Sequence, residues 1–107
     1  MIKQGDIIIV DFDPQAGHEQ KGRRPAVIVS NDSFNQFSSM YMICPITNVN
    51  KIHPFHIPLD DKTNTNGVIL CDQARVFDIK ARNFEFIERL PNEILDKLKQ
   101  LLIGFIE

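Results

Sequence analysis

The sequence predicts one mainly β domain that ends in a single α-helix, with the architecture of a small barrel or a strongly bent sheet. Three observations support this prediction. The chain has 107 residues, 43% of them hydrophobic, which fits a single globular domain over residues 1–107. Short β-branched runs recur between turn residues, and a helical apolar period is found only near the C-terminus.

Two strands are expected in the first thirty residues. The run at 7–12, Ile-Ile-Ile-Val-Asp-Phe, is rich in β-branched side chains and ends before Pro14, which cannot donate to a sheet ladder. Pro25 begins a second strand, Ala-Val-Ile-Val-Ser at 26–30. The Asn-Asp pair at 31–32 is expected to turn the chain.

The strand pattern continues through the middle of the chain. Further apolar runs lie at 41–47, 56–59, 68–71 and 74–79, and the last of these continues or follows the one before it. Pro45 indicates a sheet edge or a bulge in the first of these runs. The sequence Asn-Thr-Asn-Gly at 64–67 is a strong turn signal. Phe84 and Phe86 would share one face of a further strand, where packing in the core or at a dimer interface is expected.

The period of the apolar residues changes between Pro91 and Gly104. Leucine and isoleucine side chains recur there at spacings of three and four, which gives one apolar helical face. Glu93 in the first turn favours the helix dipole, and Gly104 is a suitable residue for the C-terminal end. One amphipathic helix is therefore expected to close the domain.

The charge and the cysteines limit the functions that the chain can have. Twelve basic and fourteen acidic residues give a net charge of -2, so the chain lacks the overall basic surface of a protein that wraps nucleic acid. Any site for a polyanion must be local. Cys44 and Cys71 each lie in an apolar run and look like core thiols of a reducing compartment. With no leader or membrane-spanning run either, a soluble, cytoplasmic protein is expected.

The polar segment at 14–24 is the most informative stretch of the sequence. A long polar loop between two strands is either a solvated connection or a functional site, and its composition alone does not decide between them. A functional reading requires a base, which Glu19 or His18 could supply, and a cation for phosphate. Arg24 suits the second role, because a guanidinium matches phosphate with two hydrogen bonds and Pro25 anchors it at the start of a strand.

Residues 5–12 read Gly-Asp-Ile-Ile-Ile-Val-Asp-Phe, and residues 17–29 read Gly-His-Glu-Gln-Lys-Gly-Arg-Arg-Pro-Ala-Val-Ile-Val. This combination resembles the MazF/PemK (Kid-like) family of toxin endoribonucleases, whose pattern is a Gly-Asp strand, a Gly-Ser-Glu-Gln loop and Arg-Pro entering an apolar strand. Further matches lie at 45–48, 67–73 and in the terminal helix. The sequence departs from the pattern at His18, where the family commonly has serine.

The resemblance implies an SH3-like barrel of the type shared by MazF, PemK and CcdB toxins. It also implies that Arg24 and Thr47 are the catalytic pair and that Glu19 supports them. Which of Glu19, His18 or Arg24 takes the proton stays open, because it depends on burial. The residues expected to contact RNA are His18, Gln20, Lys21, Arg23 and Gln73.

No metal ion or cofactor is expected. His53 and His56 invite a zinc interpretation, but Pro54 lies between them and neither Cys44 nor Cys71 has a C-x2-C partner. The resemblance therefore implies a metal-independent, sequence-specific endoribonuclease (an mRNA interferase) that uses the 2′-hydroxyl of single-stranded RNA and forms a 2′,3′-cyclic phosphate. It also implies a homodimer inhibited by a cognate antitoxin of a type II toxin–antitoxin pair.

Two other functions are compatible with such a barrel. A CcdB-like toxin shares the fold but binds and poisons DNA gyrase, without nuclease chemistry. A degenerate regulatory module is the third hypothesis. The Glu-Gln loop, the Arg-Pro pair and Thr47 occur together in this sequence, and their combination favours the nuclease.

Overall fold

The structure, a computed structural model, describes residues 2–12, 22–48 and 53–107. The described strands are β1 Asp6–Asp11, β2 Arg23–Ile28, β3 Tyr41–Thr47, β4 His56–Pro58, β5 Val68–Leu70, β6 Arg75–Phe77 and β7 Phe84–Arg89. Two α-helices, α1 Asp32–Ser38 and α2 Asn92–Gly104, accompany them, together with three single-turn 3-10 helices, η1 Asp60–Lys62, η2 Cys71–Gln73 and η3 Ile79–Ala81.

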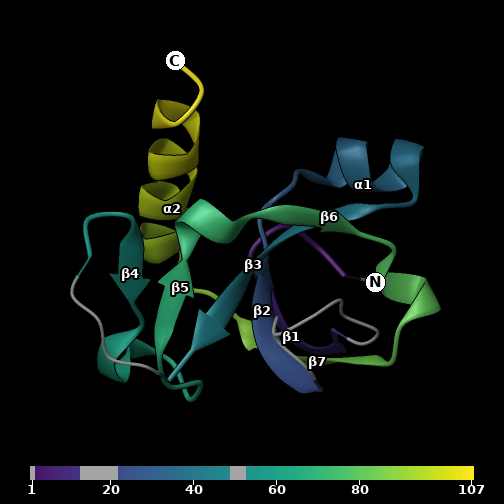
Figure 1. Cartoon of the computed structure of the whole chain (residues 1–107), viewed down its shortest axis with the longest axis horizontal. Coiled ribbons are helices and arrows are strands. Elements are labelled where there is room, and N and C mark those ends of the chain that lie inside the picture. Colours follow the sequence, from purple (N-terminus) through teal and green to yellow (C-terminus); the bar gives the residue numbers. More distant parts are fainter. Residues whose placement is uncertain (1, 13–21, 49–52) are drawn as a thin grey trace.

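All of these strands pair antiparallel in one sheet, in the order β4-β5-β3-β2-β1-β7, and β6 pairs with the first residues of β3. Figure 1 shows the sheet bending strongly, with α2 standing beside β4 and β5 and α1 on the far side. The predicted mainly β fold with a C-terminal helix is confirmed. Within the described ranges no pairing joins β4 to β7, and the strongly bent sheet is compatible with the predicted small barrel.

The sheet buries side chains on both faces, because successive residues of a strand point to opposite sides. One face carries a core cluster that α2 covers with Ile94, Leu95 and Leu98. The other face carries a second cluster, which includes Val10, Ala26, Ile28, Ile43 and Phe77. A strand that is buried on both faces needs apolar side chains at successive positions, which explains the nearly continuous apolar runs in the sequence.

The expected turn at 31–32 is instead the start of α1. The Asn31 side chain accepts a hydrogen bond from the backbone N–H of Phe34 at 2.8 Å, which caps the helix. The helix ends after two turns at Ser39, whose φ of 60° is left-handed. An asparagine serves both a turn and a helix N-cap, and this ambiguity explains the error.

The expectation that Pro45 marks a sheet edge or a bulge is also wrong, because β3 lies inside the sheet between β2 and β5. The Val29 N–H donates a hydrogen bond to the Met42 carbonyl, so the backbone polar groups of Met42 point toward β2. These groups point to alternate edges of a strand from one residue to the next, so those of Pro45 point away from β2, toward β5 and β6. There β6 pairs only with residues 41–43 and β5 only with residues 46–47. The proline therefore lies at a gap in the ladder, where no N–H is needed.

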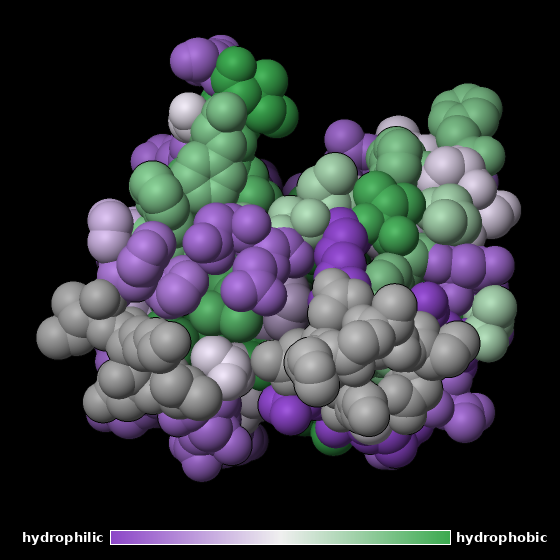
Figure 2. All heavy atoms as spheres, in the orientation of Figure 1, coloured by the Kyte–Doolittle hydropathy of each residue, from purple (hydrophilic) through white to green (hydrophobic). Residues whose placement is uncertain are grey.

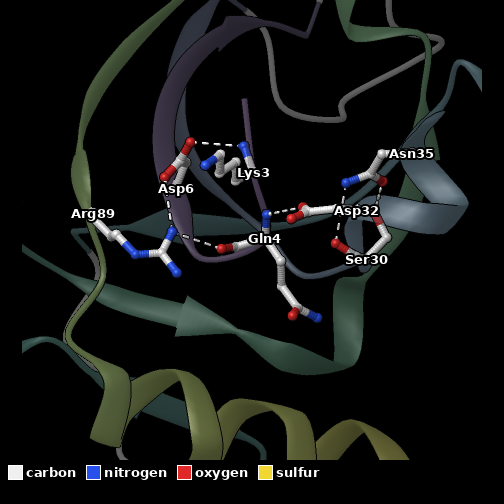
Figure 3. Close-up of polar contacts among 7 residues, drawn as sticks. All are labelled: Lys3, Gln4, Asp6, Ser30, Asp32, Asn35 and Arg89. Atoms are coloured by element: carbon white, nitrogen blue, oxygen red, sulfur yellow. Dashed lines mark hydrogen bonds and ion pairs between the residues drawn. The ribbon is translucent and has the colours of Figure 1, made fainter. Parts of the chain in front are cut away.

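The Gly-Asp pair at the start of β1 joins the two ends of the chain (Figure 3). The Asp6 carboxylate accepts hydrogen bonds from the Lys3 N–H at 2.8 Å and from Arg89 Nη1 at 3.2 Å. Gly5 has a φ of +92°, and a Cβ there would lie 2.9 Å from Leu95 Cδ2 on α2. These contacts attach the start of β1 to β7 and α2, which explains why glycine and aspartate occupy these positions.

Glu88 on β7 holds the turn that precedes β5. Its carboxylate accepts from the N–H of Asn64 at 3.2 Å and from the N–H and hydroxyl of Thr65, both at 2.8 Å. Partial burial raises the pKa of Glu88, but these hydrogen bonds outweigh that effect and hold the pKa below its usual value of 4.5. The charged form of Glu88 is therefore the form that stabilises the fold.

We expect Glu88→Gln to lower the free energy of unfolding at neutral pH by roughly 1–2 kcal/mol, because the amide keeps only one accepting oxygen. Because the pKa of Glu88 is lower in the folded protein than in the unfolded chain, its charged form stabilises the fold above pH 4.5. This stabilisation is lost as the pH falls through the lowered pKa. The difference between wild type and variant in urea unfolding should therefore shrink in acid. A difference that stays constant from neutral to acid pH would contradict the assignment.

Candidate functional site

The structure describes four of the eight residues that the sequence singles out for chemistry or RNA contact. Arg23 and Arg24 begin β2, Thr47 ends β3, and Gln73 ends η2. The other four, His18, Glu19, Gln20 and Lys21, lie outside the described residues. The geometry below therefore concerns the sheet side of the site.

Arg24 and Thr47 lie near corresponding ends of the paired strands β2 and β3. The register joins Ile28 to Ile43, Val27 to Cys44 and Ala26 to Pro45. Continued by two residues, the same register sets Arg24 opposite Thr47. Directly opposed residues of an antiparallel pair point to the same face, with Cβ atoms about 5 Å apart. Both residues are half-buried, and both have further interactions. One phosphate can therefore contact both side chains.

Gly67 fixes the position of Thr47 from the other edge of β3. Thr47 pairs with Val68, and a Cβ on Gly67 would lie 2.9 Å from the carbonyl carbon of Thr47. The φ of Gly67, +124°, is a conformation that other residues rarely adopt. The Gly67 carbonyl accepts a hydrogen bond from the Leu59 N–H at 3.0 Å. This bond fixes Gly67 in its position against the Thr47 backbone. Glycine is therefore required for β5 to reach the end of β3.

Gln73 lies beside the same stretch of β3. It ends η2, which fills the gap opposite Pro45, and its side chain is exposed. Arg75, two residues later, pairs with Ile43. The structure thus places Gln73 along the strand that carries Thr47, where an amide could read the edge of a base.

Arg23 differs from its neighbour in its surroundings. Its guanidinium donates to the Asn83 carbonyl at 3.1 Å and contacts the Glu85 carboxylate at 3.5 Å. Successive residues of a strand point to opposite faces, so Arg23 and Arg24 leave β2 on different sides. Of the two arginines, only Arg24 lies on the same face of the sheet as Thr47.

A histidine pair lies next to Gln73. His56 Nε2 is 3.1 Å from Asp72 Oδ1, and the rings of His53 and His56 stack with centroids 4.4 Å apart. Ligand atoms of these three residues lie within 4.8 Å of one another, so they are the group in the described chain that could approach a metal ion. Sequence spacing alone missed Asp72. The hydrogen bond to Asp72 and the N–H that Phe55 donates to His53 also give this group a role without an ion.

Two arginines that the sequence analysis did not single out lie near this face. The Arg75 guanidinium lies over the rings of Phe12 and Phe77, at 5.6 and 5.4 Å from their centroids. The Arg82 guanidinium lies 4.1 Å from the Phe77 centroid and donates to the Asp11 carbonyl. No sequence motif links these residues, because Phe12 and Arg75 lie far apart in the chain and meet only in the fold.

The two cysteines belong to the core. Both are fully buried and unpaired. Burial raises the pKa of Cys44 far above its usual value and raises that of Cys71 to about 12. Both thiols therefore stay protonated at neutral pH, which makes them poor metal ligands and poor nucleophiles.

Comparisons with known proteins identify the family of the chain. A family model described as PemK-like, MazF-like toxin of type II toxin-antitoxin system matches residues 3–106. The chain belongs to this family. It is 38% identical to the endoribonuclease PemK of Escherichia coli, over 94% of this chain and 82% of that protein. It is 35% identical to the endoribonuclease EndoA of Bacillus subtilis, over 95% and 91%.

Solved structures of the PemK-like, MazF-like family share the fold. MazF from Deinococcus radiodurans superimposes with a TM-score of 0.86 at 32% identity, over 98% of this chain and 96% of that one. A MazE–MazF structure from the same organism gives 0.85 at 32% identity, over 98% and 95%. The predicted family and class of enzyme are confirmed, and the gyrase-poisoning alternative is not favoured. In the described part of the chain, no helix is long and apolar enough to cross a membrane.

We expect Gly67→Ala to lower the free energy of unfolding by about 1–3 kcal/mol, because a strained φ and a contact with the Thr47 backbone are both imposed. The amide resonance of Thr47 should shift in NMR spectra of the folded variant. Gly104→Ala is the matched control, because a Cβ there has no neighbour within 4 Å. Wild-type stability and an unmoved Thr47 resonance in Gly67→Ala would show that β5 does not position Thr47.

Proposed function

We propose that residues 1–107 form one toxin domain that cleaves single-stranded RNA, such as mRNA, at specific sequences and without a metal ion. One observation carries the proposal: the register of β2 and β3 pairs Ala26 with Pro45. Continued by two residues, this register sets Arg24 opposite Thr47 on one face of the sheet. The family match and the endoribonuclease names of the relatives support the same reaction.

The reaction uses the RNA's own 2′-hydroxyl as the nucleophile. A base removes its proton, the 2′-oxygen bonds to phosphorus, and the bond from phosphorus to the 5′-oxygen breaks as an acid protonates that oxygen. The products are a 2′,3′-cyclic phosphate and a free 5′-hydroxyl. Arg24 stabilises the charge that builds on the phosphoryl oxygens with two parallel hydrogen bonds, and the Thr47 hydroxyl donates a third. Glu19 supports this pair, and Glu19 and His18 are the candidate bases.

Recognition of the RNA falls to residues around this pair. Gln73 is placed along β3 to pair with a base edge, because its amide offers both a donor and an acceptor. The remaining proposed contacts come from the loop and the start of β2, namely His18, Gln20, Lys21 and Arg23. A net charge of -2 fits short, splayed RNA better than a long duplex, because affinity then depends on a few local contacts.

We propose that the chain works as a homodimer. Figure 2 shows hydrophobic side chains over the C-terminal end of α2 and again over α1, with a hollow between them. Val29, Phe34, Met42 and Ile103 are among the residues that line this hollow. Phe37 and Ile106 are 93% and 86% exposed, more than a monomer of this size requires. A second copy would cover these side chains.

We propose further that a cognate antitoxin inhibits the toxin in the cytoplasm, where mRNA is found. Structures of MazE with MazF and of a mycobacterial endoribonuclease with its antitoxin support such a partner. An acidic tail of the antitoxin would compete with RNA for the cations Lys21, Arg23 and Arg24.

Excess EDTA should leave RNA cleavage intact, and the upstream product should end in a 2′,3′-cyclic phosphate. Arg24→Ala should slow cleavage by about 10²–10³, comparable to losing one oxyanion donor. Arg24→Lys should recover little of this loss, because an ammonium cannot hold two phosphoryl oxygens in a fork. Thr47→Val, nearly the same shape, tests the hydroxyl alone.

Cleavage of a defined RNA oligonucleotide, with product ends identified by mass spectrometry, measures these effects. Lys97→Gln, an exposed change on α2, is the control for altered charge and should cleave like wild type. A 5′-phosphate product, loss of activity in EDTA or full activity in Thr47→Val would overturn the mechanism.

The partner proposals are tested together by light scattering and binding. The chain alone should have twice the 12.3 kDa mass of one copy at micromolar concentration. Charge reversal at Lys21 and Arg23 should weaken antitoxin binding mainly through the association rate, since surface charges steer encounter. A monomer, or unchanged antitoxin affinity in that double variant, would reject the corresponding partner proposal.

A further inference from the structure

Arg75 shares a face of the sheet with the Arg24–Thr47 pair. It begins β6 and pairs with Ile43, which in turn pairs with Ile28 on β2. Residues two or four apart on one strand point to the same side, so Arg75 faces the side that Thr47 faces from the end of β3. The three residues thus lie on one surface, with Gln73 just before Arg75 in the chain.

The surroundings of Arg75 differ from those of three other described arginines, only some of which lie near the site. Arg23 contacts Glu85, Arg82 donates to the Asp11 carbonyl and Arg89 is bound to Asp6. Arg75 is half-buried and has two aromatic contacts, with Phe12 and Phe77. In the part of the chain that the structure describes, no hydrogen bond or ion pair to its guanidinium is found.

These ring contacts orient the Arg75 guanidinium but accept no hydrogen bond from its N–H groups at the edge of the plane. An aromatic ring attracts the face of a guanidinium and leaves its five N–H donors, which lie at the edge of the plane, available for a ligand. Phe12 is fully buried and Phe77 nearly so, and both belong to the second core cluster. The platform is therefore rigid, and little side-chain entropy remains to be lost when an anion binds.

We propose that Arg75 binds a phosphate of the RNA strand other than the scissile one; this inference rests on the proposed function. Ile43, the partner of Arg75, is four residues from Thr47, which is about 13 Å along a strand. This backbone separation places Arg75 beside a neighbouring position of the strand rather than opposite Thr47. Gln73 lies between the two positions, so a base held there would have a bound phosphate on either side.

The role assigned to Arg75 is binding and not chemistry. Its contact is equally strong in the bound substrate and in the transition state, so its loss should raise KM and leave kcat nearly unchanged. A contact between a cation and a phosphate also releases counterions from the RNA. Each such contact adds about 0.7 to the magnitude of the slope of log affinity against log salt concentration for single-stranded RNA. The rise in KM at constant kcat and the smaller salt slope distinguish the proposed role of Arg75 from that of Arg24.

The test is Arg75→Gln, compared with wild type in cleavage and in binding to an RNA whose scissile 2′-hydroxyl is replaced by hydrogen. We expect the Kd, from fluorescence anisotropy, to rise about tenfold and the salt slope to fall by about 0.7. Arg75→Lys should restore the slope but only part of the affinity, because an ammonium stacks less well on the two rings. Lys97→Gln is the charge-matched control and should change neither quantity.

The outcomes distinguish this inference from the proposed function. A wild-type chain that neither binds nor cleaves RNA would defeat the proposed function itself. An active wild type with unchanged Kd and salt slope in Arg75→Gln would overturn only the role of Arg75. A loss confined to kcat would overturn it as well, and would move Arg75 into the chemistry. Should Arg75→Gln fail to fold, a salt slope in Arg75→Lys that differs from wild type would count against a phosphate contact.

Discussion

The pairing of β2 with β3 is the interaction on which the candidate site depends. Strand side chains alternate between faces, so a slip of one residue would turn Arg24 and Thr47 to opposite sides of the sheet. Core residues on both faces prevent that slip. Val27 and Cys44 belong to the cluster under α2, and Ala26 and Ile43 belong to the cluster on the other face. Burial on both faces thus fixes the geometry of a half-exposed polar pair.

The far edge of β3 is interrupted between its two neighbouring strands. β5 and β6 share this edge, and η2 separates them where Pro45 has no N–H to donate. The break exposes Gln73 and Asp72 beside the strand. Glu88 holds the turn before β5, and Gly67 lets that strand approach the Thr47 carbonyl. A chain of contacts from β7 therefore reaches the end of β3, and changes far from Arg24 can alter the site.

Under the proposed function, an acidic chain binds a polyanion through a local anion site. The net charge of -2 gives no long-range attraction, and the cations that matter are a few arginines on one face of the sheet. Aromatic rings of the second core cluster support two of them, Arg75 and Arg82. The anion site is thus continuous with the core, so its geometry is as rigid as the sheet beneath it.

The sequence by itself predicted the elements whose signals are local. The β-branched runs, the Asn-Gly turn and the helical period at 91–104 each identify their own structure, because they depend on neighbours within a few residues. The ordered motifs around Arg24 and at Thr47 likewise identified the family. Local signals were ambiguous where one residue type serves two structures, and α1, read as a turn at Asn31, is the example.

Tertiary structure alone decided which distant residues meet. Without the family motif, nothing distinguishes Thr47 from any other threonine at a strand end. The β2–β3 register, continued past Ala26 and Pro45, sets it opposite Arg24. Asp72 joined His56, and Arg75 came to lie over Phe12, because strands far apart in the chain pair side by side. Such contacts depend on sheet order and register, which the burial of the whole core selects and which no short stretch of sequence contains.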